Sequence, residues 1–207
     1  ITNGYDPSDF DSIPPMKFPQ FTIVYLGKFR TGESFRDPTY FFYALNEMKK
    51  QNISVRFVHV GEKDSEVIRM ATNSGVADIC YFAGLCSYRE AIGYAKGADL
   101  LLLIGGGQKT EQTGKIFDYL GCRRPILAIA SKDSGIADVI HGISGAVMVE
   151  NGNSASIAMA IEAQRLKEYS ENVISDACYV NYHRRFLTSN LANIFGQVTG
   201  KLFSNRL

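Results

Sequence analysis

Residues 113 to 118 combine groups that can hold a diphosphate with a group that can hold a sugar. Thr113 and Gly114 precede a predicted short helix, and Lys115 lies in its first turn. The first N–H groups of a helix have no partner inside it and lie at the positive end of its dipole, so they suit an anion. Asp118 shares the helix face of Lys115 and could accept hydrogen bonds from ribose or sugar hydroxyls. This spacing indicates a nucleotide-sugar site, and the alternative is an exposed Lys115–Asp118 ion pair worth under about 1 kcal/mol.

Further cations follow the first predicted strand. Lys28, Arg30 and Arg36 lie in or just after the loop that begins at Gly27. Ammonium and guanidinium groups both bind phosphate oxygens, and the planar guanidinium can do so through two hydrogen bonds. We expect these side chains to supply positive charge beside the same anion, although surface cations often only solvate a face.

Three common motifs of nucleotide-binding proteins and hydrolases are absent from the sequence. Glycines 105 to 107 are followed by Gly114 and Lys115, but Lys109 stands where a P-loop requires its first glycine, and Ile116 where it requires Ser or Thr. The loop of residues 27–32 lacks the Gly-x-Gly-x-x-Gly spacing of dinucleotide-binding proteins. No Gly-x-Ser-x-Gly segment occurs. These absences disfavour a P-loop NTPase, a dehydrogenase and an α/β hydrolase.

The bulk composition is that of an ordinary globular protein. The chain has 207 residues, of which 45% are hydrophobic and 21% charged, and its formal net charge of +1 gives no indication of a nucleic-acid partner. The longest apolar run, from Ala98 to Ile104, is too short to span a membrane. The four cysteines and three histidines have no zinc-site spacing, so we expect reduced thiols, no metal site and a cytoplasmic protein. Peripheral attachment to the inner membrane face stays open for a full-length protein.

Short apolar strands alternate with amphipathic helices along the middle of the chain. About six strand–helix alternations with short connections predict a doubly wound, Rossmann-like α/β fold with a parallel sheet of about six strands. In such sheets ligands bind at the carboxyl ends of the strands. The near absence of polar residues in 98–104 predicts a strand buried on both faces. The predicted strands are 21–26, 53–60, 78–83, 98–104, 125–130 and 146–150, and the predicted helices are 38–50, 62–73, 88–96, 115–120, 134–141 and 154–167.

The two ends of the chain do not continue this pattern. Residues 1–17, with Asn-Gly, Pro-Pro and three aspartates, suit an interdomain linker. Residues 18–167 are the predicted nucleotide-sugar-binding domain, and residues 168–207 a C-terminal helical extension. Apolar residues at helical spacing between 180 and 205 predict a helix whose apolar face must pack on something. The chain begins at Ile1, with no Met and no basic segment ahead of an apolar stretch, so we expect no signal peptide and expect the chain to begin within a longer protein.

The segment from Thr113 to Leu127 resembles a stretch of the group 1 (family 4-like) glycosyltransferases, which have the GT-B fold. In that family the stretch reads Lys-x-Phe-Glu-Tyr, a hydrophobic residue, and then Pro-Ile-Leu. Other segments are similar in the same order, namely 1–6 to the interdomain crossover, 25–27 to the first strand and glycine loop, and 98–103 to the strand before the donor loop. The resemblance spans residues 1 to about 165 and implies the C-terminal, donor-binding domain.

This resemblance implies a hexosyltransferase-type enzyme that moves a sugar, with retention, from a nucleoside diphosphate sugar to a glycan or lipid-linked acceptor. The pathway would be glycan or polysaccharide synthesis. An N-terminal domain of the same protein would hold most of the acceptor, so the 207-residue chain alone should turn over little. The alternatives are a nucleotide-sugar epimerase half and a non-catalytic sugar-nucleotide-binding module.

Individual residues carry over where they match the family's motifs. Asp118 takes the position of the acid that binds the ribose, Thr110 takes that of the first acid, and Glu111 is adjacent. Lys28 stands in place of the usual Arg after the glycine, and Glu33 stands where Lys is expected, so Arg36 is the candidate for the second charge. The segment Gly84-Leu85-Cys86 takes the position of the loop that meets the nucleobase, or it is a plain turn.

The predicted mechanism stabilises the departing diphosphate electrostatically and needs no metal or other cofactor. Asp118 would orient the ribose, and Glu111 or the backbone at Gly105 and Gly106 would contact the sugar. The groups predicted at the diphosphate are Lys28 or Arg30, Arg36, Lys115 and the N–H groups at Thr113 and Gly114. Lys115, Arg36 and Glu111 are the predicted catalytic residues.

Overall fold

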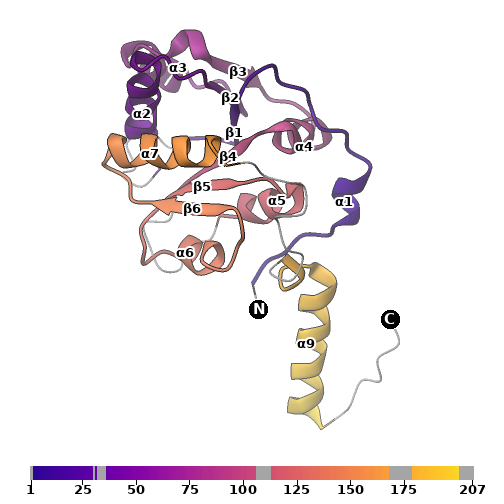
Figure 1. The fold of residues 1–207 in the computed structure, drawn as a ribbon. Helices are drawn as coiled ribbons and strands as arrows, with labels where there is room; N and C mark the ends of the chain where they lie inside the picture. The colour runs from indigo at the N-terminus through magenta and orange to yellow at the C-terminus, as the bar shows by residue number, and fades with distance from the viewer. Residues whose placement is uncertain (1, 30, 32–35, 106–112, 168–178, 201–207) are drawn as a thin grey trace.

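The computed structural model describes residues 2–29, 31, 36–105, 113–167 and 179–200, which form one parallel sheet with helices on both faces (Figure 1). The strands lie in the order β3-β2-β1-β4-β5-β6, and every neighbouring pair is parallel. The predicted doubly wound, six-stranded sheet is therefore confirmed. The strands are β1 Thr22–Leu26, β2 Arg56–Val60, β3 Cys80–Gly84, β4 Leu100–Ile104, β5 Ile126–Ile129 and β6 Ala146–Val149.

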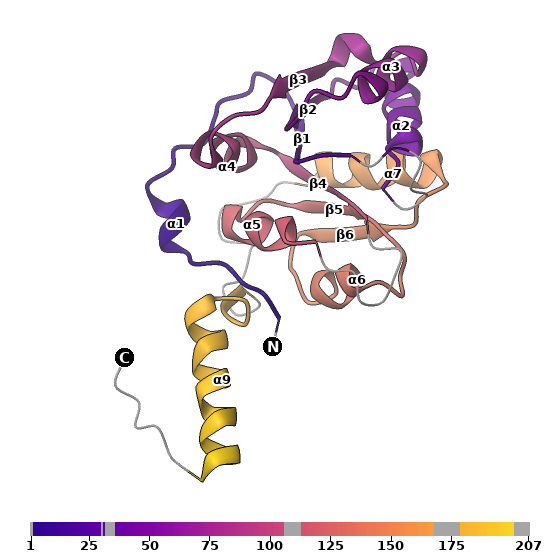
Figure 2. The ribbon, with the colours of Figure 1, turned by 180° about the vertical axis from the view of Figure 1, so that it is seen from behind.

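The helices cover the two faces of the sheet in separate sets (Figures 1 and 2). Side chains of α1, α4, α5 and α6 share one core with the strands, and those of α2, α3 and α7 share the other. All five residues of β4 are buried, as predicted for a strand covered on both faces. The helices are α1 Ser8–Asp11, α2 Thr39–Lys50, α3 Ser65–Asn73, α4 Tyr88–Gly97, α5 Lys115–Cys122, α6 Gly135–Ile140, α7 Ser154–Arg165 and α9 Arg184–Thr199, with a 3₁₀ turn, η1, at Ala77–Ile79.

Several predicted boundaries differ from the structure by two or three residues, and two of these differences have a clear local cause. Helix α3 begins at Ser65 and not at residue 62, because Asp64 caps it by accepting a 2.9 Å hydrogen bond from the Glu66 N–H. Strand β3 begins only at Cys80, since the residues before it form η1. The other predicted strands and helices of the domain agree with the structure to within a few residues.

The N-terminal segment packs against the domain, although its composition predicts an irregular linker. Tyr5, Phe10 and Ile13 are buried in the core that α4 and α5 share. Phe10 lies directly against Gly121 of α5, where a Cβ atom would overlap the phenyl ring. Three apolar residues thus decide the packing of a mainly polar segment. Its role as a crossover between domains stays a prediction.

Helix α9 extends away from the body of the domain (Figures 1 and 2). Its base is fastened to the N-terminal segment, because the Tyr5 N–H donates to the Tyr182 carbonyl at 3.0 Å and the Arg184 N–H donates to the Tyr5 carbonyl at 2.9 Å. The predicted C-terminal helix is therefore confirmed. None of the helices in the described ranges is both long and apolar enough to cross a membrane. The exposed apolar side chains of α9 include Leu191, Ile194, Phe195 and Val198.

Candidate functional site

The strand order reverses between β1 and β4, and ligands of such folds bind at the carboxyl ends of the strands at this point. The backbone pairing between the two strands ends at Val24 and Leu101. Beyond it, Tyr119 of α5 bridges the strands, because its hydroxyl accepts from the Leu26 N–H and donates to the Leu102 carbonyl, both at 2.9 Å. Directly below the candidate site, hydrogen bonds of the fully buried Tyr119 side chain thus join the two strands where their backbone groups no longer pair.

Lys115 reaches from the first turn of α5 over the end of β1. Its ammonium lies 3.9 Å from the centroid of the Tyr25 ring, which is a cation–π contact. Gly27 leaves room for this side chain, since a Cβ atom at Gly27 would lie 3.3 Å from the Lys115 Nζ atom. The φ of +95° at Gly27 also disfavours any other residue. The Tyr25 ring is stacked on Phe29 with centroids 4.0 Å apart, so the support beneath the ammonium is rigidly packed.

Arg36 places a second cation near the Lys115 ammonium. Its Nε atom lies 3.7 Å from the position that a Cβ of Gly105, the residue after β4, would take. Burial and the positive charge of Arg36 lower the pKa of Lys115 to about 7, while the negative charge of Asp118 acts in the opposite direction. The positive charge of Arg36 disfavours the charged form of Lys115, and an anion bound beside the two would relieve this repulsion.

Asp118 contacts α4, while Lys115 extends over β1. The Oδ1 atom of Asp118 accepts a 2.9 Å hydrogen bond from the hydroxyl of Tyr88, the first residue of α4. Burial raises the pKa of Asp118, whereas the Tyr88 hydrogen bond and the charges of Arg184 and Lys115 lower it. Between the two described side chains of Lys115 and Asp118 no ion pair forms, so the alternative raised by their spacing is excluded in this structure.

His59 lies beneath the glycine turn, although sequence reasoning assigns it no role. Its side chain is buried in β2, and the ring Nε2 lies 2.6 Å from the Gly27 carbonyl oxygen. Because a carbonyl only accepts, Nε2 must carry the proton, and the buried Nδ1 has no hydrogen-bond partner. Burial, and next the charge of Lys115, lower the pKa of His59, while the hydrogen bond to Gly27 raises it. A neutral imidazole thus supports the turn over which Lys115 lies.

We expect acid to destabilise the protein through His59. Because the pKa of the folded ring lies below its ordinary 6.5, the unfolded chain binds a proton that the folded ring does not. The free energy of unfolding should therefore fall as the pH drops below about 6.5. Urea denaturation between about pH 7.5 and about pH 5 measures this loss.

The matched comparison for this experiment is His59→Gln. The glutamine amide can keep a hydrogen bond to the Gly27 carbonyl without titrating in this range. The variant should therefore lose less stability than the wild type between neutral and acid pH. Identical pH dependence in the two proteins would contradict a role of His59 in acid sensitivity.

Other predicted site residues lie on either side of this centre. Lys28 forms an exposed ion pair with Glu62 at 3.1 Å, so its positive charge is already shared with a carboxylate. Thr113 and Gly114 lead into α5, and the Thr113 carbonyl accepts from the Ile116 N–H at 3.2 Å, as in a first helical turn. Among the described cations predicted at the diphosphate, Lys115 and Arg36 are the two that the structure brings close together.

The loop predicted to meet the nucleobase follows the carboxyl end of β3, on the side of the sheet where the carboxyl ends of β1 and β4 also lie. Gly84 ends the strand, and Leu85 and Cys86 are exposed before the start of α4. In the described ranges no three His, Cys, Asp or Glu side chains are placed to hold a metal ion. Three residues of the predicted site, Arg30, Gly106 and Glu111, lie outside the described residues, as do Glu33 and Thr110, which depart from the family pattern.

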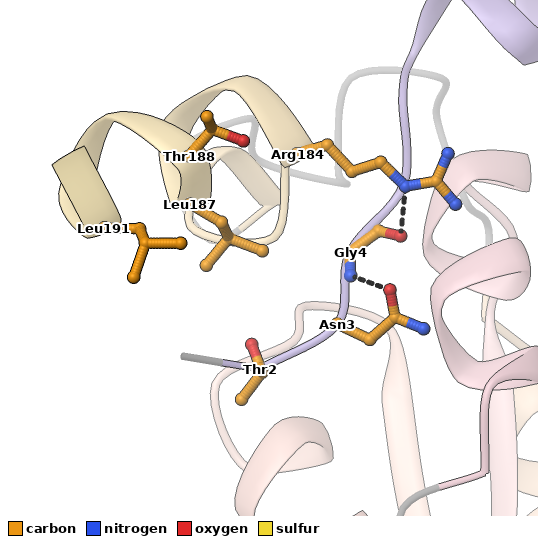
Figure 3. A pocket seen from close by; sticks show the side chains of 7 residues that line it. All are labelled: Thr2, Asn3, Gly4, Arg184, Leu187, Thr188 and Leu191. Carbon is orange, nitrogen blue, oxygen red and sulfur yellow. Dashed lines mark hydrogen bonds between the residues drawn. The ribbon is translucent and has the colours of Figure 1, made fainter.

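Two cavities lined by described residues lie away from the carboxyl ends of β1 and β4. One, of about 210 Å³, lies between the N-terminal segment and the first turns of α9, where Arg184 donates to the Gly4 carbonyl at 3.1 Å (Figure 3). The other, of about 440 Å³, lies between α2 and α7. Neither contains any of the predicted site residues, so the candidate site rests on the convergence of its side chains and not on a cavity.

Sequence reasoning misses Tyr25, His59, Tyr88 and Tyr119. Each carries a polar group on an otherwise apolar or helical stretch whose pattern predicts only burial or a cap. A polar atom on a residue that is predicted to be buried must find a partner, so His59 and Tyr119 could be singled out as candidates. Their partners are set by tertiary contacts between distant segments, which the local pattern does not contain.

The fold is that of an α/β domain in which Lys115 and Arg36 lie near the carboxyl ends of β1 and β4. Residues 20–164 match the sequence model of the glycosyl transferases group 1 family. The chain therefore belongs to this family, which confirms the resemblance of the segment from Thr113 to Leu127. A comparison with curated protein sequences gave no match.

Solved structures share the fold at low sequence identity. Sucrose-phosphate synthase from Thermosynechococcus elongatus is 13% identical with a TM-score of 0.68, over 97% of this chain and 52% of that one. HepE from Anabaena in complex with UDP-glucose is 15% identical with a TM-score of 0.67, over 95% of this chain and 57% of that one. The C-terminal domain of the group 1 glycosyl transferase LpcC from Francisella tularensis is 16% identical with a TM-score of 0.62, over 91% of this chain and 98% of that one. The chain thus spans about half the length of the first two structures and nearly all of the isolated domain.

Proposed function

We propose that this chain is the donor-binding domain of a glycosyltransferase that uses a nucleoside diphosphate sugar. The observation that carries the proposal is the convergence of Lys115, Gly27 and Arg36 at the carboxyl ends of β1 and β4. It occurs in a chain that belongs to the group 1 family. An ammonium and a guanidinium held at one place match the paired charges of a diphosphate. The UDP-glucose bound to HepE supports a donor of this class.

The proposed chemistry is electrostatic stabilisation of the leaving group. As the bond between the sugar and the diphosphate breaks, negative charge grows on the phosphate oxygens, and Lys115 and Arg36 stabilise it. The start of α5 adds the positive end of a helix dipole. Asp118 accepts a hydrogen bond from a ribose hydroxyl. An acceptor hydroxyl oxygen forms the new bond to the anomeric carbon with retention, and its proton passes to the departing diphosphate. This division of roles requires no metal ion.

The acceptor is proposed to bind on an N-terminal domain of a longer protein. The chain spans about half of two structurally similar proteins and nearly all of an isolated C-terminal domain, which supports this division. The exposed apolar residues of α9 would then pack toward that domain. The acceptor is a glycan or a lipid-linked glycan, and the 207-residue chain alone turns over little because half of the cleft is missing.

A thermal-shift series with UDP, GDP, ADP and the corresponding nucleotide sugars tests the proposal. A ligand at about one hundred times its dissociation constant stabilises the folded state by about 2.7 kcal/mol, which corresponds to a rise in Tm of about 5–10 °C for a domain of this size. The matching monophosphates should stabilise less, because they lack one of the two phosphates. If no diphosphate raises the Tm of the wild type, the proposed function is wrong.

A further inference from the structure

Tyr88 occupies a fixed position at the edge of the candidate site. It is the first residue of α4, and the start of that helix is locked by a capping box in which Ser87 and Glu90 exchange hydrogen bonds. The loop of Leu85 and Cys86 comes directly before it. The Tyr88 ring is 55% exposed, so its position is set by the helix start and not by burial in the core.

The hydroxyl of Tyr88 is joined to the acid that is expected to hold the ribose. It donates a 2.9 Å hydrogen bond to the Oδ1 atom of Asp118, which links α4 to α5. A carboxylate can accept hydrogen bonds on both oxygens. Among the described residues Tyr88 is the one hydrogen-bond donor to Asp118, so the Oδ2 atom stays available for a ligand.

The surroundings of Asp118 make this hydrogen bond consequential. The carboxyl group is half-buried on α5, and burial raises its pKa, whereas the Tyr88 hydrogen bond lowers it. The net shift of the Asp118 pKa is upward, and the hydroxyl opposes it by favouring the ionised form, which accepts hydrogen bonds most strongly. It also restricts the rotation of the carboxylate, because one of its oxygens is tied to a helix start that cannot shift easily.

We propose that Tyr88 is a positioning residue for the ribose of the donor nucleotide, and that the Tyr88–Asp118 pair selects ribonucleotides over deoxyribonucleotides. Tyr88 holds Oδ1 so that Oδ2 accepts a hydrogen bond from a ribose hydroxyl. This inference rests on the proposed donor-binding function. To the ribose contact already proposed for Asp118 it adds Tyr88, a residue that the sequence motifs do not contain.

The experiment measures the dissociation constants of three proteins by calorimetry. The wild type, Tyr88→Phe and Asp118→Ala are each titrated with whichever of UDP, GDP and ADP binds the wild type most tightly, and with its 2′-deoxy and 3′-deoxy forms. The wild type should discriminate against at least one deoxy form by about tenfold, as expected for a hydrogen bond to a charged group. Tyr88→Phe should weaken binding of the ribonucleotide about 3- to 10-fold and bring its affinity close to that of the deoxy form.

A matched control separates this effect from a loss of structure. Tyr43 on α2 is 47% exposed, similar to Tyr88, and lies on the opposite face of the sheet, so Tyr43→Phe should bind like the wild type. The double variant of Tyr88→Phe and Asp118→Ala should bind no more weakly than Asp118→Ala alone, because the two residues act as one unit. If Tyr88→Phe retains the discrimination of the wild type, the positioning role is overturned while the donor-binding function stands. If none of the three diphosphates binds the wild type, the donor-binding function fails and the inference falls with it.

Discussion

Lys115→Met is expected to weaken the binding of UDP-glucose, or of the nucleotide sugar that the wild type prefers, by about 10- to 100-fold. The methionine keeps most of the length of the side chain and removes the charge that lies over the Tyr25 ring. A charge-assisted hydrogen bond to a phosphate oxygen is worth about 1.5–3 kcal/mol, which sets this range. In a full-length enzyme the transfer rate should fall further, by about 10²–10³-fold, because charge on the leaving diphosphate grows in the transition state.

The same residue should make donor binding depend on pH. The pKa of Lys115 is lowered to about 7 by burial and by Arg36, so the ammonium loses its proton around pH 7 in the free protein. A bound diphosphate favours the protonated form, and affinity should therefore weaken as the pH rises through about 7. A nucleotide sugar is the right probe, since it lacks the terminal phosphate group that titrates near pH 6.

Lys115→Arg provides the matched test, because a guanidinium stays protonated over the whole range. Its affinity for the same nucleotide sugar should be nearly constant between about pH 6 and about pH 8.5, whatever its absolute value. Lys115→Met should unfold at the same or a higher denaturant concentration than the wild type, since it removes a partly buried charge beside Arg36. If Lys115→Met binds the nucleotide sugar as tightly as the wild type, Lys115 does not contact the ligand. If the affinity of the wild type does not change with pH, the titration of Lys115 does not affect binding.

The sheet and the position of the candidate site at the carboxyl ends of its strands could be predicted from the sequence, because both follow from local patterns. Six short apolar strands separated by helices permit few arrangements once crossovers are right-handed, and β4 shows by its lack of polar residues that it is covered on both faces. The carboxyl ends of the strands then indicate the candidate site. Lys115 and Gly27 could be selected from spacing and family resemblance, and the structure places them in contact distance.

The remaining features of the site depend on pairs of residues that are distant in sequence. The spacing of Lys115 and Asp118 predicts a shared helix face, yet one extends over β1 and the other contacts Tyr88 on α4. Lys28 follows the glycine turn, as the family pattern suggests, but its charge meets Glu62 after the neighbouring strand. A long side chain can reach several partners, and the choice among them is made by neighbours that only the folded chain supplies.

Tyr119→Phe should lower the free energy of unfolding by about 2–4 kcal/mol, although it removes a single oxygen atom. The hydroxyl pairs both the Leu26 N–H and the Leu102 carbonyl in a fully buried place, and each group left without a partner costs about 1–3 kcal/mol. The ladder between β1 and β4 has already ended at Val24, so no neighbouring strand can take over these two groups without a backbone shift. Urea denaturation monitored by circular dichroism measures the change.

Tyr25→Phe is the control that isolates this bridging role. Its hydroxyl also belongs to a buried tyrosine, but it donates only one hydrogen bond, to the Lys28 carbonyl at 3.0 Å in a loop next to solvent. Water can replace that donor, so the loss should stay below about 1.5 kcal/mol. Equal losses in the two variants would mean that the hydroxyl of Tyr119 does not hold the strands together. A larger loss for Tyr119→Phe, accompanied by weaker nucleotide binding, would instead show that the link between β1 and β4 also sets the position of Lys115, because Tyr119 and Lys115 project from successive turns of α5.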